Sequence, residues 1–365
     1  MWTIDLDGEG GPVVWHLERA TVAVAAAVSY QRAQEIAERL PGGAAGPWSA
    51  AAPDSNPSTG TDLVATMVAR LAAIGRLRQA REAARGGVSF NLPAQEIEAE
   101  GDTYALRWDR SRPVENWNAQ ISLLTGIVAA RSLVDAGTGV LRTLPPPLPE
   151  DLARLRATSA ALGLTWPPGM TYPDLVRSLD PDRPEANAFM LQATRVLRGA
   201  GYLALSPGGP GPDSPEARHS AIASVYAHVT APLRRLVDRF DNEILLAHFA
   251  GRTPPAWATE ALEELPAIMN DANRRQSGLD RALLDFTEAV VLAPRVGERF
   301  KGLVVDVDDQ RPRARVQIAE PAVAASVTRP DGWSVQLGQQ LELRLDAVDP
   351  DEGTVTFRPV ADNGS

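Results

Sequence analysis

The sequence has 365 residues, no cysteine and a formal net charge of -10 at pH 7. Without cysteine there can be no disulfide, thiolate metal site or cysteine nucleophile, so any metal must bind oxygen or imidazole. The acidic balance argues against a protein that coats nucleic acid, although it allows a local basic channel. No stretch approaches the roughly 18 consecutive apolar residues of a membrane span, and the start has no signal region. We therefore expect a cytoplasmic protein without membrane contact.

Arginine carries almost all of the positive charge, because Lys301 is the only lysine. The guanidinium group is planar and permanently charged, and it can hold a phosphate through two parallel hydrogen bonds. The accompanying richness in alanine, proline and glycine is typical of a GC-rich genome.

The N-terminal segment alternates polar and apolar residues on either side of Asp7-Gly8, a pair that favours a tight turn. This pattern predicts two strands joined as a hairpin. Ser29 is expected to cap a helix over residues 29–40, and residues 41–60 are expected to form a flexible loop because they are rich in proline, glycine, alanine and serine.

A longer amphipathic helix is predicted from a cap at Asp62 to about Arg85, where Gly86-Gly87 would end it. Two strands are then expected, at residues 88–92 (VSFNL) and at residues 103–108 (TYALRW).

The segment that begins at Val114 is apolar on nearly all sides at helical spacing, which predicts a buried helix at the centre of the domain. Helices with proline-rich joints are expected to follow as far as about Leu205. Another helical pair is predicted between Pro255 and Leu292.

After Ala293 the pattern changes from helical spacing to short β-rich runs. The five expected strands lie within residues 295–308, 314–320, 333–337, 339–349 and 353–360. This arrangement predicts an OB-type barrel. The expected fold class is α+β, with a helix-rich domain over residues 1–293 and a five-stranded β-barrel over residues 294–365.

The strongest chemical signal is the sequence YAHVTAPLRR at residues 226–235. Thr230 or Ala231 is predicted to cap a helix in which Pro232 occupies the favoured first position. The two arginines would then meet a free helix N-terminus, which attracts phosphate.

Asp238 follows Arg234 by four residues and Arg235 by three, a spacing at which its carboxylate can hold a guanidinium in place. From the residues alone, the pattern is equally consistent with a salt-bridged, capped helix that has no catalytic role.

This stretch resembles the RNB (ribonuclease II) family motif Y-x-H-F-T-S-P-I-R-R-Y-x-D. The departures from that motif are conservative or apolar, at Val229, Ala231, Leu233 and Leu236. Other family landmarks are resembled in the same order by Ser29-Tyr30, residues 87–90, residues 118–124 and residues 142–145. The C-terminal barrel is similar to the RNA-binding barrel that follows the catalytic domain in this family.

The resemblance implies that Arg234 contacts the scissile phosphate and supports its transition-state charge. It implies that Phe90 stacks on bases and that Tyr30 holds the terminal nucleotides. The further RNA-contacting positions are Tyr226, His228, Thr230 and Arg235, with Asp238, Gln120 and Asn118 in support; His219 also matches a family position. Near Gln120 the family tends to carry glutamate, so a substrate-orienting role does not carry over directly. The alternative for the aromatic and histidine residues is a purely structural place in the core.

The resemblance also implies Mg²⁺, which the family binds through an Asp-rich run placed before the segment with which this sequence begins. No such run is found here, and we expect the acidic groups Asp5/Asp7, Asp306/Asp308/Asp309 and Asp349/Asp351 to be turn or surface residues. A misplaced start codon, a truncation or a degenerate protein would each explain this.

The leading hypothesis is an RNB-family 3′-to-5′ exoribonuclease that acts on single-stranded RNA by metal-assisted hydrolysis, without its metal-binding segment. A non-catalytic RNA-binding relative is the first alternative. The second is a helical protein-interaction module, which the acidic net charge favours slightly.

Overall fold

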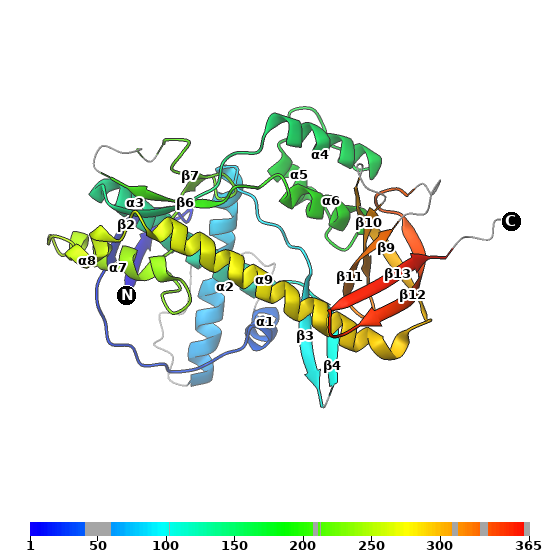
Figure 1. The fold of residues 1–365 in the computed structure, drawn as a ribbon. Coiled ribbons are helices and arrows are strands. Elements are labelled where there is room, and N and C mark those ends of the chain that lie inside the picture. The colour runs from blue at the N-terminus through cyan, green and yellow to red at the C-terminus, as the bar shows by residue number, and fades with distance from the viewer. Residues whose placement is uncertain are drawn as a thin grey trace. The chain divides into compact units, whose positions relative to one another are not determined.

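The computed structural model describes residues 1–40, 60–101, 103–206, 211, 213–308, 313–328 and 335–360. The predicted loop over residues 41–60 lies outside this part, apart from Gly60. The chain forms two compact units from interleaved segments (Figure 1). The first unit contains residues 1–89, 111–146 and 197–271, and the second contains residues 90–110, 147–196 and 272–365.

The first unit opens with the predicted hairpin, in which β1 (Trp2–Leu6) pairs antiparallel with β2 (Pro12–Leu17). The Asp7 carboxylate accepts hydrogen bonds from two backbone N–H groups of the turn, which explains the tight reversal. Helix α1 (Tyr30–Arg39) follows, and the hydroxyl of Ser29 accepts a hydrogen bond from the N–H of Arg32. Both the hairpin and the Ser29 cap are thus confirmed.

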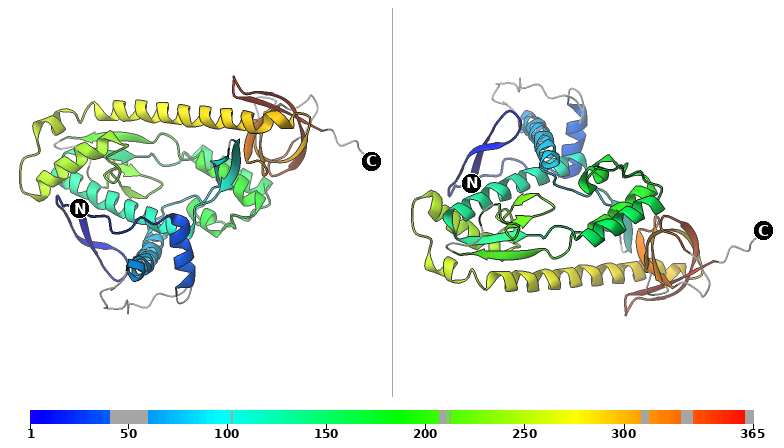
Figure 2. Two further views of the ribbon diagram at one scale, coloured as in Figure 1. Left: turned by 90° about the horizontal axis from the view of Figure 1, so that it is seen from below. Right: turned by 90° about the horizontal axis from the view of Figure 1, so that it is seen from above.

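Helix α2 (Gly60–Ala84) lies against the hairpin, whose Gly10 packs closely on Leu77 (Figure 2). Because α2 begins at Gly60, Asp62 lies inside the helix and the predicted cap at Asp62 is wrong. The predicted strand at residues 88–92 is also absent. Val88 donates its backbone N–H to Ala221 in a loop instead, so this β-prone stretch has no neighbouring strand to pair with.

Helix α3 (Pro113–Ala136) is the predicted buried helix and forms the centre of the first unit. It is long and apolar enough to cross a bilayer, but 56% of its most apolar window is buried in the fold, as in the core helix of a globular protein. Strands β5 (Gly139–Thr143) and β6 (Gly201–Leu205) pair antiparallel beside it. β6 occupies residues that were predicted to be helical, so the helix prediction is wrong there.

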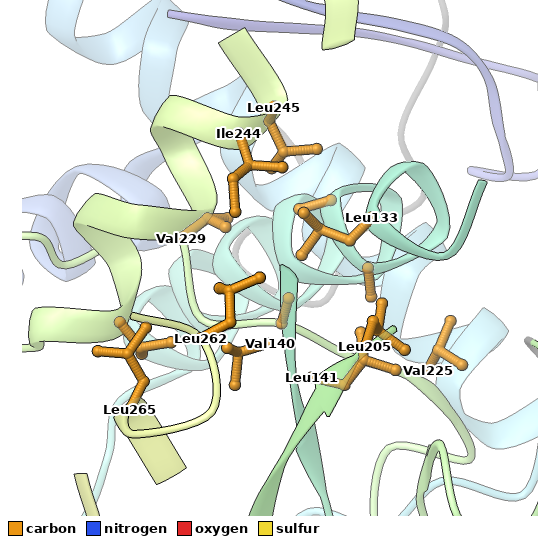
Figure 3. Packing of buried hydrophobic residues seen from close by; sticks show 14 of the residues in the cluster. Leu133, Val140, Leu141, Leu205, Val225, Val229, Ile244, Leu245, Leu262 and Leu265 are labelled. Carbon is orange, nitrogen blue, oxygen red and sulfur yellow. The ribbon is translucent and has the colours of Figure 1, made fainter. Parts of the chain in front are cut away.

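The core of this unit joins α3, β5 and β6 to α7 (Leu236–Phe249) and α8 (Ala256–Glu260) (Figure 3). Each fully buried aliphatic side chain stabilises the fold by roughly 1.5–3 kcal/mol relative to exposure. The side chains labelled in the core are Leu133, Val140, Leu141, Leu205, Val225, Val229, Ile244, Leu245, Leu262 and Leu265. Two short strands, β7 (Arg218–His219) and β8 (Ser224–Val225), lead from β6 to α7.

The second unit contains the hairpin of β3 (Ala94–Glu100) and β4 (Thr103–Asp109). Three helices follow, namely α4 (Pro149–Ala161), α5 (Tyr172–Ser178) and α6 (Pro184–Thr194). Helix α9 (Leu265–Leu292) belongs to this unit from Ala272 onward, and with α8 it confirms the predicted helical pair.

The C-terminal strands form a closed five-stranded barrel, as predicted, in the order β10-β11-β13-β12-β9 (Figures 1 and 2). The strands are β9 (Arg299–Asp308), β10 (Arg313–Ile318), β11 (Val323–Thr328), β12 (Gln340–Asp349) and β13 (Thr354–Pro359). The α+β fold class with a terminal barrel is confirmed.

One barrel strand differs from the prediction. Residues 335–337 of the expected 333–337 strand are not in a strand, and residues 333–334 lie outside the described residues. Strand β11 takes its place and closes the barrel by pairing with β10 and β13. Its alanine-rich sequence has a weak β pattern, so barrel closure rather than local propensity selects it.

Candidate functional site

Helix α7 begins at Leu236 with Arg235 as its N-cap residue, so the predicted cap at Thr230 or Ala231 is wrong. The cause is Asp238, whose Oδ1 accepts the backbone N–H of Ala231 at 2.7 Å. This bond folds the preceding residues into a separate turn, so the helix starts about one turn later than the proline suggests.

Arg235 and Asp238 form a two-point ion pair at the start of α7. The Nε of Arg235 donates to Oδ2 of Asp238 at 2.9 Å, and its Nη2 donates to Oδ1 at 2.8 Å. The Asp238 side chain is fully buried, and that of Arg235 is 15% exposed. Arg235 also donates to the hydroxyl of Thr230 at 3.4 Å. Asp238 therefore holds a guanidinium, as its spacing predicted, but the partner is Arg235.

Arg234 lies in the exposed turn before α7. Within the described part of the chain, its side chain makes no hydrogen bond or ion pair. Its charge still acts on His228, where it contributes to the lowered pKa of the imidazole. The two adjacent arginines therefore differ: Arg235 braces the turn, and Arg234 presents an unpaired cation beside His228.

His228 shares a hydrogen bond of 3.1 Å between its Nδ1 and the hydroxyl of Tyr202 on β6. The Arg142 guanidinium on β5 stacks over the Tyr202 ring at 4.6 Å from its centroid. Burial, together with the nearby charges of Arg235 and Arg142, lowers the pKa of His228 to about 3. At neutral pH the imidazole is therefore uncharged and cannot repel the arginines around it.

Tyr226 packs on α3 at Gly126, where an added Cβ would lie 2.1 Å from the tyrosine ring. The backbone N–H of the next residue, Ala227, donates to the Gly126 carbonyl at 3.1 Å. Burial raises the pKa of the Tyr226 hydroxyl. Tyr226 also meets the rings of His228 and His219 edge to face. A side chain at Gly126 would push this whole segment away from α3.

The other hydroxyl of the motif, that of Thr230, lies 2.9 Å from the hydroxyl of Ser122 on α3. His219 is half-buried, and burial lowers its pKa to about 4, with Arg142 as the second cause. Because Thr230 is exposed, its hydroxyl can contact a ligand in addition to the Ser122 hydroxyl.

Tyr30 and Asn118 are brought together, since the Asn118 amide donates to the Tyr30 hydroxyl at 2.9 Å. Tyr30 is 47% exposed, which leaves its ring available for stacking. Gln120 is buried, and its amide donates to the Glu82 carboxylate, which also accepts from the hydroxyl of Ser89 at 2.7 Å. Gln120 is thus engaged inside the fold.

Phe90 belongs to the second unit and is partly buried there. Its predicted role in stacking on bases stays a prediction.

The sequence alone did not single out Tyr202, Arg142 or Glu82 as site residues. Arg142 and Tyr202 are direct cross-strand partners of β5 and β6. The sequence did not predict this pairing, because residues 201–205 were expected to be helical. Glu82 carried no local signal, because it stands inside a long, regular helix.

No group of three or more His, Asp or Glu side chains that could hold a metal ion occurs among the described residues. The carboxylate of Asp238 is occupied by Arg235 and Ala231. Asp241 is fully buried; its Oδ1 accepts the N–H of Val140, and burial raises its pKa well above the ordinary range. Mg²⁺ prefers ionised oxygen ligands in open, partly hydrated sites. These carboxylates do not fit Mg²⁺.

Residues 1–250 match the RNB domain, which covers more than half of the chain. The chain belongs to the RNB family. Residues 298–360 match the RNase II-type exonuclease C-terminal S1 domain, which corresponds to the barrel. The family was thus identified correctly from the motif. The two matches leave residues 251–297 between them, and the domain boundary near Pro294 stays a prediction.

Among curated proteins, this RNB-family chain is similar to Ribonuclease R of Escherichia coli (strain K12) and of Shigella flexneri. The identity to each is 26% over 319 residues, covering 77% of this chain and 38% of the relative. The chain therefore spans well under half the length of these relatives.

Among solved structures, the fold is similar to the apo form of Mycoplasma genitalium RNase R, with a TM-score of 0.77 and 17% identity. The alignment covers 98% of this chain and 57% of that one. The same protein in complex with double-stranded RNA has a TM-score of 0.76 and 18% identity, with coverage of 98% and 59%.

Proposed function

We propose that this chain is the RNA-holding part of a 3′-to-5′ exoribonuclease, in which Arg234 contacts a phosphodiester of single-stranded RNA. The observation that carries this proposal is the exposed Arg234, unpaired among described side chains, next to the buried Arg235–Asp238 pair. A guanidinium without a carboxylate partner keeps its donors for a phosphate.

Each neighbouring group supports a role in binding. Asp238 and Ala231 hold the turn that carries Arg234. His228 stays neutral, so its pair with Tyr202 adds no charge that would compete with Arg234. Tyr30, held by Asn118 and half-exposed, is suited to stack on a base, an interaction worth about 1–3 kcal/mol per base.

The whole reaction requires more than these residues. The family's metal-assisted hydrolysis uses Mg²⁺, which would activate water and neutralise the leaving oxygen. The contribution that we propose for the described residues of this chain is phosphate and base binding. M. genitalium RNase R has been solved with ribose-methylated single-stranded RNA and with double-stranded RNA, which supports RNA as the ligand class. We place the protein in a bacterial cytoplasm.

The experiment is to measure the affinity of the purified chain for a short single-stranded RNA across a series of salt concentrations. Arg234→Ala is expected to weaken binding and to reduce the slope of log K against log salt by about 0.7, the value for one phosphate contact on a single strand. Arg234→Lys should restore only part of the affinity, because an ammonium cannot reproduce two-point contact.

Arg239 provides a matched control, since it is an exposed arginine on α7 with no described ion pair. Arg239→Ala should leave both affinity and slope close to those of the original chain. An unchanged salt slope in Arg234→Ala would remove Arg234 from the site. A chain that does not bind RNA at all would support the protein-interaction alternative.

A further inference from the structure

A second concentration of positive charge lies in a cavity of about 370 Å³ in the first unit. Its wall includes Arg78, Arg81 and Arg85 from α2 and Arg131 from α3, together with Gly11 of the hairpin and Ser224 of β8. The three α2 residues are spaced at i, i+3 and i+7, so they share one helix face. The cavity has no residue in common with the Arg234 site.

Nearby carboxylates neutralise only part of the positive charge of these guanidinium groups. Arg81 pairs with Asp7 at 3.2 Å and with Glu9 at 3.0 Å. Arg78 donates to the backbone carbonyl of Gly10 at 2.7 Å. Arg85 donates to the carbonyl of Ile222 at 2.6 Å. A carbonyl accepts a hydrogen bond but does not cancel a charge.

Within the described residues, no carboxylate forms an ion pair with Arg78, Arg85 or Arg131. Glu82, on the same helix, forms no described ion pair with these residues, and its charge offsets those of Arg78 and Arg85 only in part. Arg78, Arg85 and Arg131 therefore share one cavity with incomplete neutralisation.

Burial makes this arrangement costly in the absence of an anion. Arg78 is only 3% exposed, and the Nε of Arg78 and the Nη2 of Arg85 are buried without a hydrogen-bond partner. Burial, together with the charges of Arg85, Arg81 and Arg131, lowers the pKa of Arg78 to about 10. The like charges thus act on one another across the cavity, and an anion would relieve both the repulsion and the unmet hydrogen bonding.

We propose that this cavity binds a phosphate group, independently of Arg234. A phosphate matches the site because its oxygens accept from several guanidinium groups at once and carry the required charge. Such a group can come from a free 5′-mononucleotide or from the backbone of an RNA strand. Arg131 is the accessible member, since it is exposed and has no described partner.

The test compares the original chain with Arg131→Gln and Arg131→Lys by calorimetric titration of inorganic phosphate, adenosine 5′-monophosphate and a short single-stranded RNA. Arg131→Gln should weaken phosphate and mononucleotide binding about tenfold, as for the loss of one charge-assisted hydrogen bond. Arg131→Lys should lose less. Arg85→Gln is a second variant that should act in the same direction.

Arg252→Gln is the matched control, because Arg252 is an exposed first-unit arginine that does not line the cavity. Weaker binding of all three ligands by Arg131→Gln would support a phosphodiester of RNA in the cavity. Weaker binding of phosphate and mononucleotide alone would support a free monophosphate there. Equal affinities in Arg131→Gln and Arg252→Gln would overturn the proposal. Arg234→Ala should leave inorganic phosphate binding at this cavity unchanged, so a failure of one site is distinguishable from a failure of the other.

Discussion

Arg235 meets Asp238 through two hydrogen bonds of 2.9 and 2.8 Å, while the adjacent Arg234 projects from the same turn without a described partner. One arginine is used to build the turn, which leaves the next free to contact a ligand. Mutation of the Arg235–Asp238 pair should therefore change stability, whereas mutation of Arg234 should change ligand binding.

Replacing Asp238 with alanine should lower the free energy of unfolding by about 3–5 kcal/mol. The change leaves Arg235 largely buried without its counter-charge, and removes the acceptor for the N–H of Ala231. Urea titration followed by circular dichroism would measure the loss. Arg234→Ala is the control and should change stability by no more than about 0.5 kcal/mol, as for a surface substitution. Similar stabilities for the two variants would refute a supporting role for the Arg235–Asp238 pair.

Gly126→Ala should destabilise the first unit by roughly 1–3 kcal/mol, the usual cost of overpacking. The new methyl group would lie 2.1 Å from the Tyr226 ring and 2.7 Å from the carbonyl oxygen of Ala227. Gly278→Ala offers a matched comparison, because Gly278 stands in helix α9 with open space where its Cβ would go. That control should gain about 0.5–1 kcal/mol from the helix preference of alanine. Thermal unfolding should therefore show a lower midpoint for Gly126→Ala and a higher midpoint for Gly278→Ala than for the original chain.

The neutral state of His228 predicts a loss of stability toward acid. Its pKa in the folded protein is about 3, below the value of about 6.5 expected when the chain unfolds. The unfolded chain therefore binds more protons between these values, so this contribution is fully present above about pH 6.5 and is lost progressively as the pH falls to about 3. Burial shifts His219 in the same direction.

Nuclear magnetic resonance of the imidazole carbons would follow this titration directly. His228 should remain neutral at about pH 5 in the folded chain, and it should titrate near its ordinary pKa of about 6.5 in concentrated urea. A folded-state midpoint equal to the one in urea would show that His228 is not held among the arginines.

The purified 365-residue chain is expected to hydrolyse RNA poorly or not at all. The described residues contain no group of three or more carboxylate or imidazole ligands that could hold Mg²⁺. Incubation of labelled single-stranded RNA with Mg²⁺, with and without EDTA, would check this. Robust release of mononucleotides that EDTA abolishes would contradict this prediction.

The features that depend on neighbours in sequence followed from the sequence itself. The Asp7-Gly8 turn, the Ser29 cap and the all-round apolar surface of α3 are local patterns, and each formed as expected. The order of motifs was likewise sufficient to identify the RNB family, because it needs only residue types and spacing.

Tertiary structure decided the features that need a distant partner. The β-prone residues 88–92 form a loop, in which Val88 donates its backbone N–H to Ala221. The alanine-rich β11 forms a strand because it pairs with both β10 and β13 and so closes the barrel. The start of α7 was moved by Asp238, which takes the N–H of Ala231. The site around His228 arose in the same way. Strand pairing placed Tyr202 opposite Arg142, and a hydrogen bond or an ion pair between residues far apart in sequence has no local signature.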